Sequence, residues 1–295
     1  MRQFSESDME KYYKIRLTSG GHTLELSPDA PCRLLAGGLI GFDCTGLDVS
    51  VRSYASRHGG YPERRRFAER ELGLVFEIDA GPDETEEIRR RIVTMMNPVQ
   101  TCEIDAEIYG VHRKISVIPC GEALFERETM HDRPEVSLEF IAPDVFFRAA
   151  EPEEIVFRDP VPLLTAPMSF FAGAGMTTGI MRTTDTTRLI NEGDAECGIV
   201  AEITADGGDI VNPGISCGEE FVLCPVTLSD GDTLVIDTRD RRKNIYLNGE
   251  RYFSFDRRST FFSLPAGENI VTVLCDDGAE YIRARLEYVP LYFGI

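Results

Sequence analysis

Short apolar and alternating runs, separated by glycine, proline and aspartate, fill most of this 295-residue chain. Residues 74–78 (LVFEI), 102–108 (CEIDAEI) and 137–140 (SLEF) are examples. Alternation with a period of two places apolar side chains on one face of a strand, and the residues between the runs favour turns. The pattern therefore predicts a mainly β fold.

Residues 82–97 depart from this pattern and predict the one clear helix. An acidic first turn, Pro82–Glu87, precedes apolar residues at helical spacing, and Asn97-Pro98 ends the segment. Those apolar residues are Ile88, Ile92, Met95 and Met96. Acids near a helix N-terminus suit the helix dipole, and an apolar stripe needs a surface to cover it. We expect this helix to pack against a sheet.

The chain is long for one ordinary domain and comfortable for two. Residues 144–167, directly after Pro143, combine four further prolines with an acidic cluster, which is typical of a connector. We place the boundary there, with one domain at residues 1–148 and a second at 149–295. Hairpin signals are dense in the second domain, most clearly Asn248-Gly249, and predict an antiparallel β-sandwich.

The chain carries 50 acidic and 31 basic residues, a formal net charge of −19. Binding to nucleic acid needs clustered Lys and Arg, and the arginine runs 64–66 and 89–91 are flanked by acids. We therefore expect no stable nucleic-acid binding, and interpret the runs as solvated or subunit-facing charge. An acidic surface would instead repel passing DNA.

No segment approaches the apolar run of about 20 residues that would cross a membrane, so no membrane association is expected. The polar first residues lack the features of a secretory signal, and we expect the protein to stay in the cytoplasm where it is made. The eight cysteines form no CxxC pair, and are interpreted as reduced, small core residues.

Three motifs could suggest chemistry, and each has a plainer interpretation. Gly214–Gly218 reads GxSxG, but another strand pattern follows it and no histidine lies after residue 131. The glycines of 173–179 lack a Gly-Lys-Ser/Thr, and the aspartates of 206–232 lack EF-hand spacing. We predict no catalytic residue, no cofactor and no metal site, and expect the protein not to be an enzyme.

Aromatic residues around the 248–249 turn leave a second function open. Tyr246, Tyr252, Phe253 and Phe255 could stack on sugar rings, or could equally be core residues of a hairpin. We favour core positions for Phe253 and Phe255, and leave Tyr246 and Tyr252 as possible glycan contacts. The corresponding alternative is a carbohydrate-binding module or adhesin.

Two groups of motifs resemble the distal tail proteins of siphophages. In the first half these are Gly59-Gly60, Arg66, the strand 74–78, the helix 82–97 with Asn97-Pro98, and Tyr109-Gly110. In the second half they are Asn191-Glu192-Gly193-Asp194, Ile236-Asp237-Thr238, Leu264–Asn269 and the chain terminus Tyr292–Ile295. Their order and spacing agree over nearly the whole chain.

This resemblance implies an N-terminal β-barrel-like domain with one packed helix, and a galectin-like or jelly-roll C-terminal sandwich. It also implies a homo-hexameric ring at the virion tail tip, in a phage or a prophage. Such a ring links the tail tube protein to the tail-associated hub or lysin protein, and serves as a platform for the receptor-binding protein.

Closing a ring requires two different complementary surfaces on each subunit. The mixed-charge segments around 64–70 and 82–97 are our candidates for the subunit interface. The residues selected are Arg64, Arg66, Arg89, Arg90 and Arg91.

Overall fold

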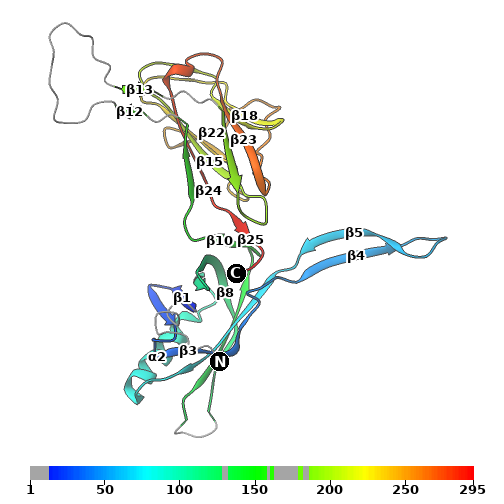
Figure 1. Ribbon diagram of the computed structural model, residues 1–295, viewed down its shortest axis with the longest axis vertical. Coiled ribbons are helices and arrows are strands. Elements are labelled where there is room, and N and C mark those ends of the chain that lie inside the picture. The colour runs from blue at the N-terminus through cyan, green and yellow to red at the C-terminus, as the bar shows by residue number, and fades with distance from the viewer. Residues whose placement is uncertain (1–12, 128–131, 158–159, 163–178, 182–185) are drawn as a thin grey trace, which may run out of the picture. The chain divides into compact units, whose positions relative to one another are not determined.

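The computed structural model describes residues 13–127, 132–157, 160–162, 179–181 and 186–295. The chain forms two compact units, one of residues 1–150 together with 292–295, and the other of residues 151–291. The chain therefore leaves the first unit once and returns to it with its last four residues (Figure 1). The glycine-rich segment discussed above lies outside the described residues, except for Gly179.

The first unit is built on a closed barrel of seven strands. In barrel order these are β8 (Val111–Glu126), β7 (Cys102–Ile108), β1 (Tyr13–Ser19), β2 (His22–Leu26), β3 (Cys32–Ile40), β6 (Arg70–Ile78) and β9 (Glu135–Ala142). Pairing of β9 with β8 closes the barrel, and the only parallel contact among these strands is the Leu26–Cys32 bridge between β2 and β3. Two short strands, β10 (Phe147–Ala149) and β25 (Leu291–Tyr292), extend the sheet beyond β8.

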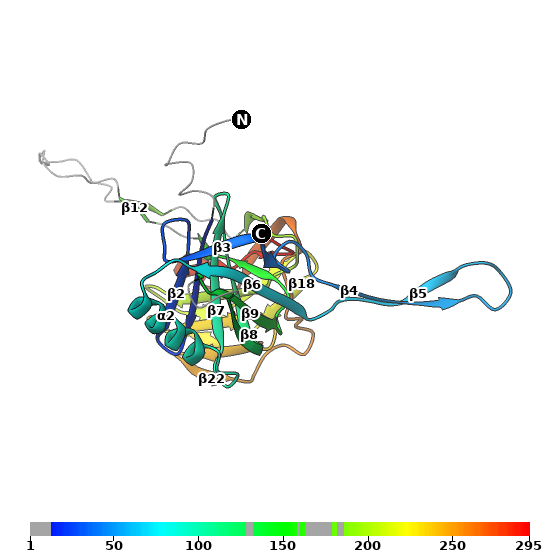
Figure 2. The ribbon, with the colours of Figure 1, turned by 90° about the horizontal axis from the view of Figure 1, so that it is seen from below.

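Alternating side chains of the barrel strands fill its interior. Along β6, for example, Leu72, Leu74, Phe76 and Ile78 are all buried. The predicted helix is confirmed as α2 (Pro82–Met95), and it buries Ile88, Ile92 and Met95 beside β2 (Figure 2). Proline at its first position suits a helix start, where no backbone donor is needed. No helix among the described residues is long and apolar enough to cross a membrane.

One hairpin of the first unit belongs to no larger sheet. The strands β4 (Leu47–Ser53) and β5 (Gly60–Phe67) pair only with each other, and their ribbon projects away from the barrel in both views (Figures 1 and 2). We call residues 47–67 the arm. A two-stranded ribbon alone in water is marginally stable, so its partners matter.

The second unit is an antiparallel sandwich, as predicted. Its six-stranded sheet runs β11 (Glu153–Val156), β24 (Ile282–Tyr288), β15 (Ile199–Ala205), β20 (Thr233–Asp237), β21 (Asn244–Leu247), β22 (Glu250–Tyr252). Its four-stranded sheet runs β14 (Thr186–Asn191), β23 (Gly267–Leu274), β17 (Gly214–Cys217), β18 (Glu220–Leu223). Residues from both sheets form one hydrophobic cluster between them.

Short elements complete the second unit. They are the pair β16 (Ile210–Val211) and β19 (Thr227–Leu228), the pair β12 (Pro160–Pro162) and β13 (Gly179–Met181), and the 3-10 turn η1 (Ala279–Tyr281). The prediction of a mainly β chain is thus confirmed in both units.

The hairpin predicted at Asn248-Gly249 is confirmed between β21 and β22. Both turn residues have positive φ, 50° and 82°, which asparagine and glycine tolerate best. The core positions expected for Phe253 and Phe255 are wrong, because these side chains are 76% and 40% exposed. The strand ends at Tyr252, so the alternation that predicted burial does not continue past it.

Candidate subunit interface

The arm has two chemically different faces, because opposite residues of an antiparallel pair point to the same side. Leu47, Val49 and Val51 alternate along β4 on one face, and they are 66%, 53% and 63% exposed. Phe67 and Pro62 lie opposite Leu47 and Val51 on that same face. The arm thus presents a row of aliphatic side chains to solvent.

The other face of the arm carries Arg64 and Arg66, two of the predicted interface residues. Arg66 Nε donates to Asp48 Oδ2 at 2.7 Å, and Arg64 Nη1 lies 3.8 Å from the same oxygen. The hydrogen bond from Arg66 lowers the pKa of the Asp48 carboxyl below its ordinary value. These two arginines therefore share one carboxylate as their ion-pair partner within the arm itself.

Arg65 lies between them in sequence but on the aliphatic face, opposite Val49. Within the part of the chain that the structure describes, no carboxylate lies within ion-pair distance of its guanidinium. The prediction did not single out this residue. The alternation of side chains along the arm could have identified it, because alternation places Arg65 on the opposite face from Arg64 and Arg66.

The three predicted interface residues of α2 have different surroundings. Arg90 Nε donates to Glu86 Oε1 at 3.1 Å, and Arg89 lies 3.8 Å from the same carboxylate and over the ring of Phe125. Arg91 instead turns toward the barrel, where its Nη1 donates to the Thr23 carbonyl at 3.4 Å. The structure does not bring these arginines together with Arg64 and Arg66, because α2 and the arm lie on opposite sides of the unit (Figure 2).

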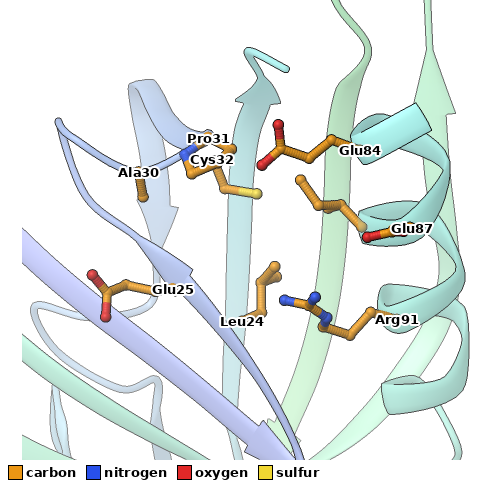
Figure 3. Close-up of a pocket in the computed structure, with 9 residues that line it drawn as sticks. Leu24, Glu25, Ala30, Pro31, Cys32, Glu84, Glu87 and Arg91 are labelled. Atoms are coloured by element: carbon orange, nitrogen blue, oxygen red, sulfur yellow. The ribbon is translucent and has the colours of Figure 1, made fainter. Parts of the chain in front are cut away.

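A pocket of about 330 Å³ lies between α2 and the β2–β3 turn, and we call it the α2 pocket (Figure 3). Leu24, Cys32 and Ile88, all buried residues, contribute to its lining, and burial raises the pKa of the Cys32 thiol to about 12. Its remaining lining residues are Glu25, Ala30, Pro31, Glu84, Glu87 and Arg91. The pocket thus combines an apolar floor with a mainly acidic rim.

The three rim acids differ in their ion pairs, and the rim also contains Arg91. Glu25 pairs with Lys14 and Arg16, at 3.3 and 3.9 Å. Glu84 and Glu87 have no ion pair with any of the described residues, and Figure 3 shows Glu84 extending from the helix toward Cys32. Neither acid was among the predicted site residues, because the sequence pattern indicated only a favourable helix N-terminus.

The two tyrosines proposed as glycan contacts lie on opposite faces of the second unit's hairpin. Tyr252 pairs with buried Ile245 and packs against the core, and its hydroxyl donates to the Pro225 carbonyl at 3.4 Å. Tyr246 pairs with Arg251 on the outer face. One sugar ring cannot stack on both.

The segment that reads GxSxG is a hairpin. Gly214–Cys217 forms β17, Gly218 turns with φ 59°, and β18 follows. The strand expected after Ser216 is confirmed, so this serine does not have the helix that follows a nucleophile elbow. Among the described residues, no group of three or more His, Cys, Asp or Glu could hold a metal ion.

All eight cysteines are free, and four of them are buried core residues. Burial raises the pKa of the Cys197 and Cys224 thiols to about 12, which keeps them protonated and unreactive. Cys44 is exposed, so the interpretation of the cysteines as core residues does not hold there.

Arg70 is a structural cation that the sequence did not reveal. It is 1% exposed, and its guanidinium donates to the carbonyls of Val145 and Gly41, both at 2.7 Å, and to that of Phe293. Burial lowers the pKa of this guanidinium. Ile295 N also donates to the Phe42 carbonyl, so the last residues of the chain are fastened to the first unit.

The motifs that carried the resemblance supply buried hydrogen bonds in the second unit. The Asn191 amide donates to the carbonyls of Ala195 and Leu264, both at 3.0 Å, and its oxygen accepts from Gly193 N. The Asn269 amide likewise donates to the carbonyls of Pro265 and Gly267, both at 2.9 Å, and so stabilises the turn that leads into β23. Buried polar groups need such partners, which explains why these residue types occupy these positions.

These features define a class of protein, a two-unit and mainly β protein with a projecting arm. Residues 192–292 match the family model of the siphovirus-type tail component, C-terminal domain. Over that range the chain is similar to this family, and the predicted resemblance to siphophage distal tail proteins is confirmed.

Two solved structures share the fold over most of the chain. The Dit protein of phage SPP1, described as a paradigm of the hub adsorption apparatus of phages infecting Gram-positive bacteria, matches with a TM-score of 0.66 at 12% identity. A chain of the phage P2 baseplate, in its activated conformation with Ca, matches with a TM-score of 0.50 at 8% identity. Each match covers 94% of this chain and 98% of the other. No curated protein sequence matches the chain.

Proposed function

We propose that six copies of this protein form a closed ring at the tip of a siphophage tail. The ring joins the last ring of the tail tube to the tail-associated hub or lysin protein, and presents a platform for the receptor-binding protein. Support comes from the fold shared with a protein of a phage hub adsorption apparatus and with a chain of a phage baseplate. The role is structural rather than enzymatic.

The observation that carries the ring is the exposed aliphatic face of the arm. Leu47, Val49 and Val51 lie on an isolated ribbon that buries none of them. Contiguous apolar surface of this kind marks interaction sites, and a two-stranded ribbon gains stability when a partner covers it. A second copy of the chain is a partner always present when the protein is made.

The position of the arm supports a ring rather than a two-fold dimer. Ring closure uses a heterologous interface, in which one surface of a subunit contacts a different surface of the next. The arm and α2 lie on opposite sides of the first unit, as such an interface requires (Figures 1 and 2). The net charge of −19 suits a lumen that lets DNA pass without binding it.

Light scattering of the purified protein, at several protein and salt concentrations, tests the ring. Six chains of 33.0 kDa give an expected mass of about 198 kDa. Val51→Asp should reduce this to the mass of one chain, because a carboxylate on the aliphatic face would be buried without a partner. A wild-type chain that remains monomeric at every concentration contradicts the ring.

Val156→Asp is the matched control for this substitution. Val156 is also an exposed valine at a strand position, on β11 of the second unit. This variant should keep the mass of the wild-type ring. Equal dissociation by both variants would indicate a general effect of added charge. It would contradict the assignment of the arm to the subunit interface.

A further inference from the structure

We propose that the aliphatic face of the arm docks into the α2 pocket of the neighbouring subunit, with Arg65 placed against the acidic rim. The inference rests on the proposed ring and identifies both halves of its interface. The occupant of the pocket is therefore a second copy of this chain, and specifically its residues 47–67.

The shapes of the two surfaces are compatible. The α2 pocket, about 330 Å³, has an apolar floor formed by Leu24, Cys32 and Ile88. Leu47, Val49 and Val51 follow each other at every second position, over about 13 Å of strand. A pocket of this volume admits aliphatic side chains, and no described residue of the same subunit's arm lines it.

The charges of the two surfaces are complementary. The arm holds five arginines against Asp48 and Glu63, a net charge of +3, in a chain whose total is −19. The arm is thus a basic segment that the acidic remainder of another copy attracts, which offsets the repulsion between two such chains.

The complementarity extends to single side chains. Arg65 is the arginine on the aliphatic face, and it has no ion pair with the described residues. Glu84 and Glu87 on the pocket rim likewise have none with that part of the chain. Docking would bring an unpaired cation to two unpaired carboxylates, while the Asp48 pairs on the opposite face of the arm stay intact.

A charge exchange tests this pairing by the mass of the assembly. Arg65→Glu alone, and Glu84→Arg with Glu87→Arg, should each lower the scattering mass about sixfold, from six chains to one. Combining all three substitutions should restore the ring, because the two charges have exchanged sides. Glu122→Arg with Glu126→Arg, two exposed acids of β8, is the matched control and should leave the ring intact.

A photocross-link locates the contact directly. Benzoylphenylalanine in place of Val51 should, on illumination, join two chains, and mass spectrometry should find the bond in residues 24–32 or 82–95. Bonds to the first-unit surface elsewhere, together with no rescue by the triple variant, would overturn the docking while leaving the ring in place. A wild-type protein that shows neither ring nor cross-link would contradict both proposals.

Discussion

The arm and the barrel strand β6 share an alternating pattern but have opposite environments. In β4, Leu47, Val49 and Val51 alternate with polar residues and are more than half exposed. In β6, Leu72, Leu74 and Phe76 also occupy every second position, with Gly73 and Val75 between them, and are buried. Alternation establishes that a strand has an apolar face, but says nothing about which molecule covers it. In this protein one face is covered by its own barrel, and we propose that a neighbour covers the other.

The largest difference between the two regions should appear when an apolar side chain is shortened in each. Leu74→Ala leaves a cavity in the barrel and should lower the free energy of unfolding by about 2–5 kcal/mol. Val51→Ala, on the exposed arm, should change the stability of the isolated chain by no more than about 0.5 kcal/mol. Chemical denaturation of the dissociated protein measures both. Equal losses of unfolding free energy in the two variants would show that Val51 is part of the folded core. The arm and β6 would then not differ in environment.

A somewhat smaller loss should follow from Arg70→Met. The substitution leaves the carbonyls of Gly41, Val145 and Phe293 without their shared donor, and should lower the free energy of unfolding by about 3 kcal/mol. Residues 292–295 should also lose protection from hydrogen exchange. Arg133→Met removes an exposed arginine that pairs with Glu77 and Asp79, and as a control it should cost about 1 kcal/mol or less.

If Arg70→Met lowers the free energy of unfolding no more than this control does, the packing of residues 292–295 does not depend on the buried guanidinium. The comparison is sharp because both residues are arginines of the first unit, and only their burial and their acceptors differ. Arg70 donates its hydrogen bonds to carbonyls and lies over the Phe147 ring, whereas Arg133 pairs with carboxylates at the surface.

The parts of the fold that sequence could predict are those that local interactions determine. The helix α2 has an acidic first turn, a proline at its start and a regular apolar stripe, and it was predicted to within two residues of its end. The Asn248-Gly249 hairpin requires positive φ at two successive positions, which few other residue pairs allow. In both cases a stretch of no more than about fifteen residues contains the interactions that determine the local structure.

The candidate site was less predictable because its contacts are distant in sequence. Arg64 and Arg66 were selected for their charge, yet both pair with Asp48 on the opposite strand. Arg65, which lies between them in sequence, has no ion pair among the described residues and could pair with another chain. Only the strand register distinguishes its environment from that of its two neighbours. The α2 pocket likewise combines residues 24–32 with residues 84–91, and no local pattern indicates that the two segments meet.

The smallest expected effect concerns the charged face of the arm. In Arg66→Gln the Asp48 carboxyl loses its strongest hydrogen bond, so its pKa should rise toward the ordinary value of 3.8. The wild-type pKa is lowered, so this carboxylate contributes stability above pH 3.8, and the contribution disappears as pH falls through the lowered pKa. NMR titration of the Asp48 carboxyl measures the shift. The mass of the ring at neutral pH should not change, because the docking face of the arm is the opposite one. A ring that dissociates in Arg66→Gln while the arm remains folded would place the charged face in the interface too, as the original selection of Arg64 and Arg66 supposed.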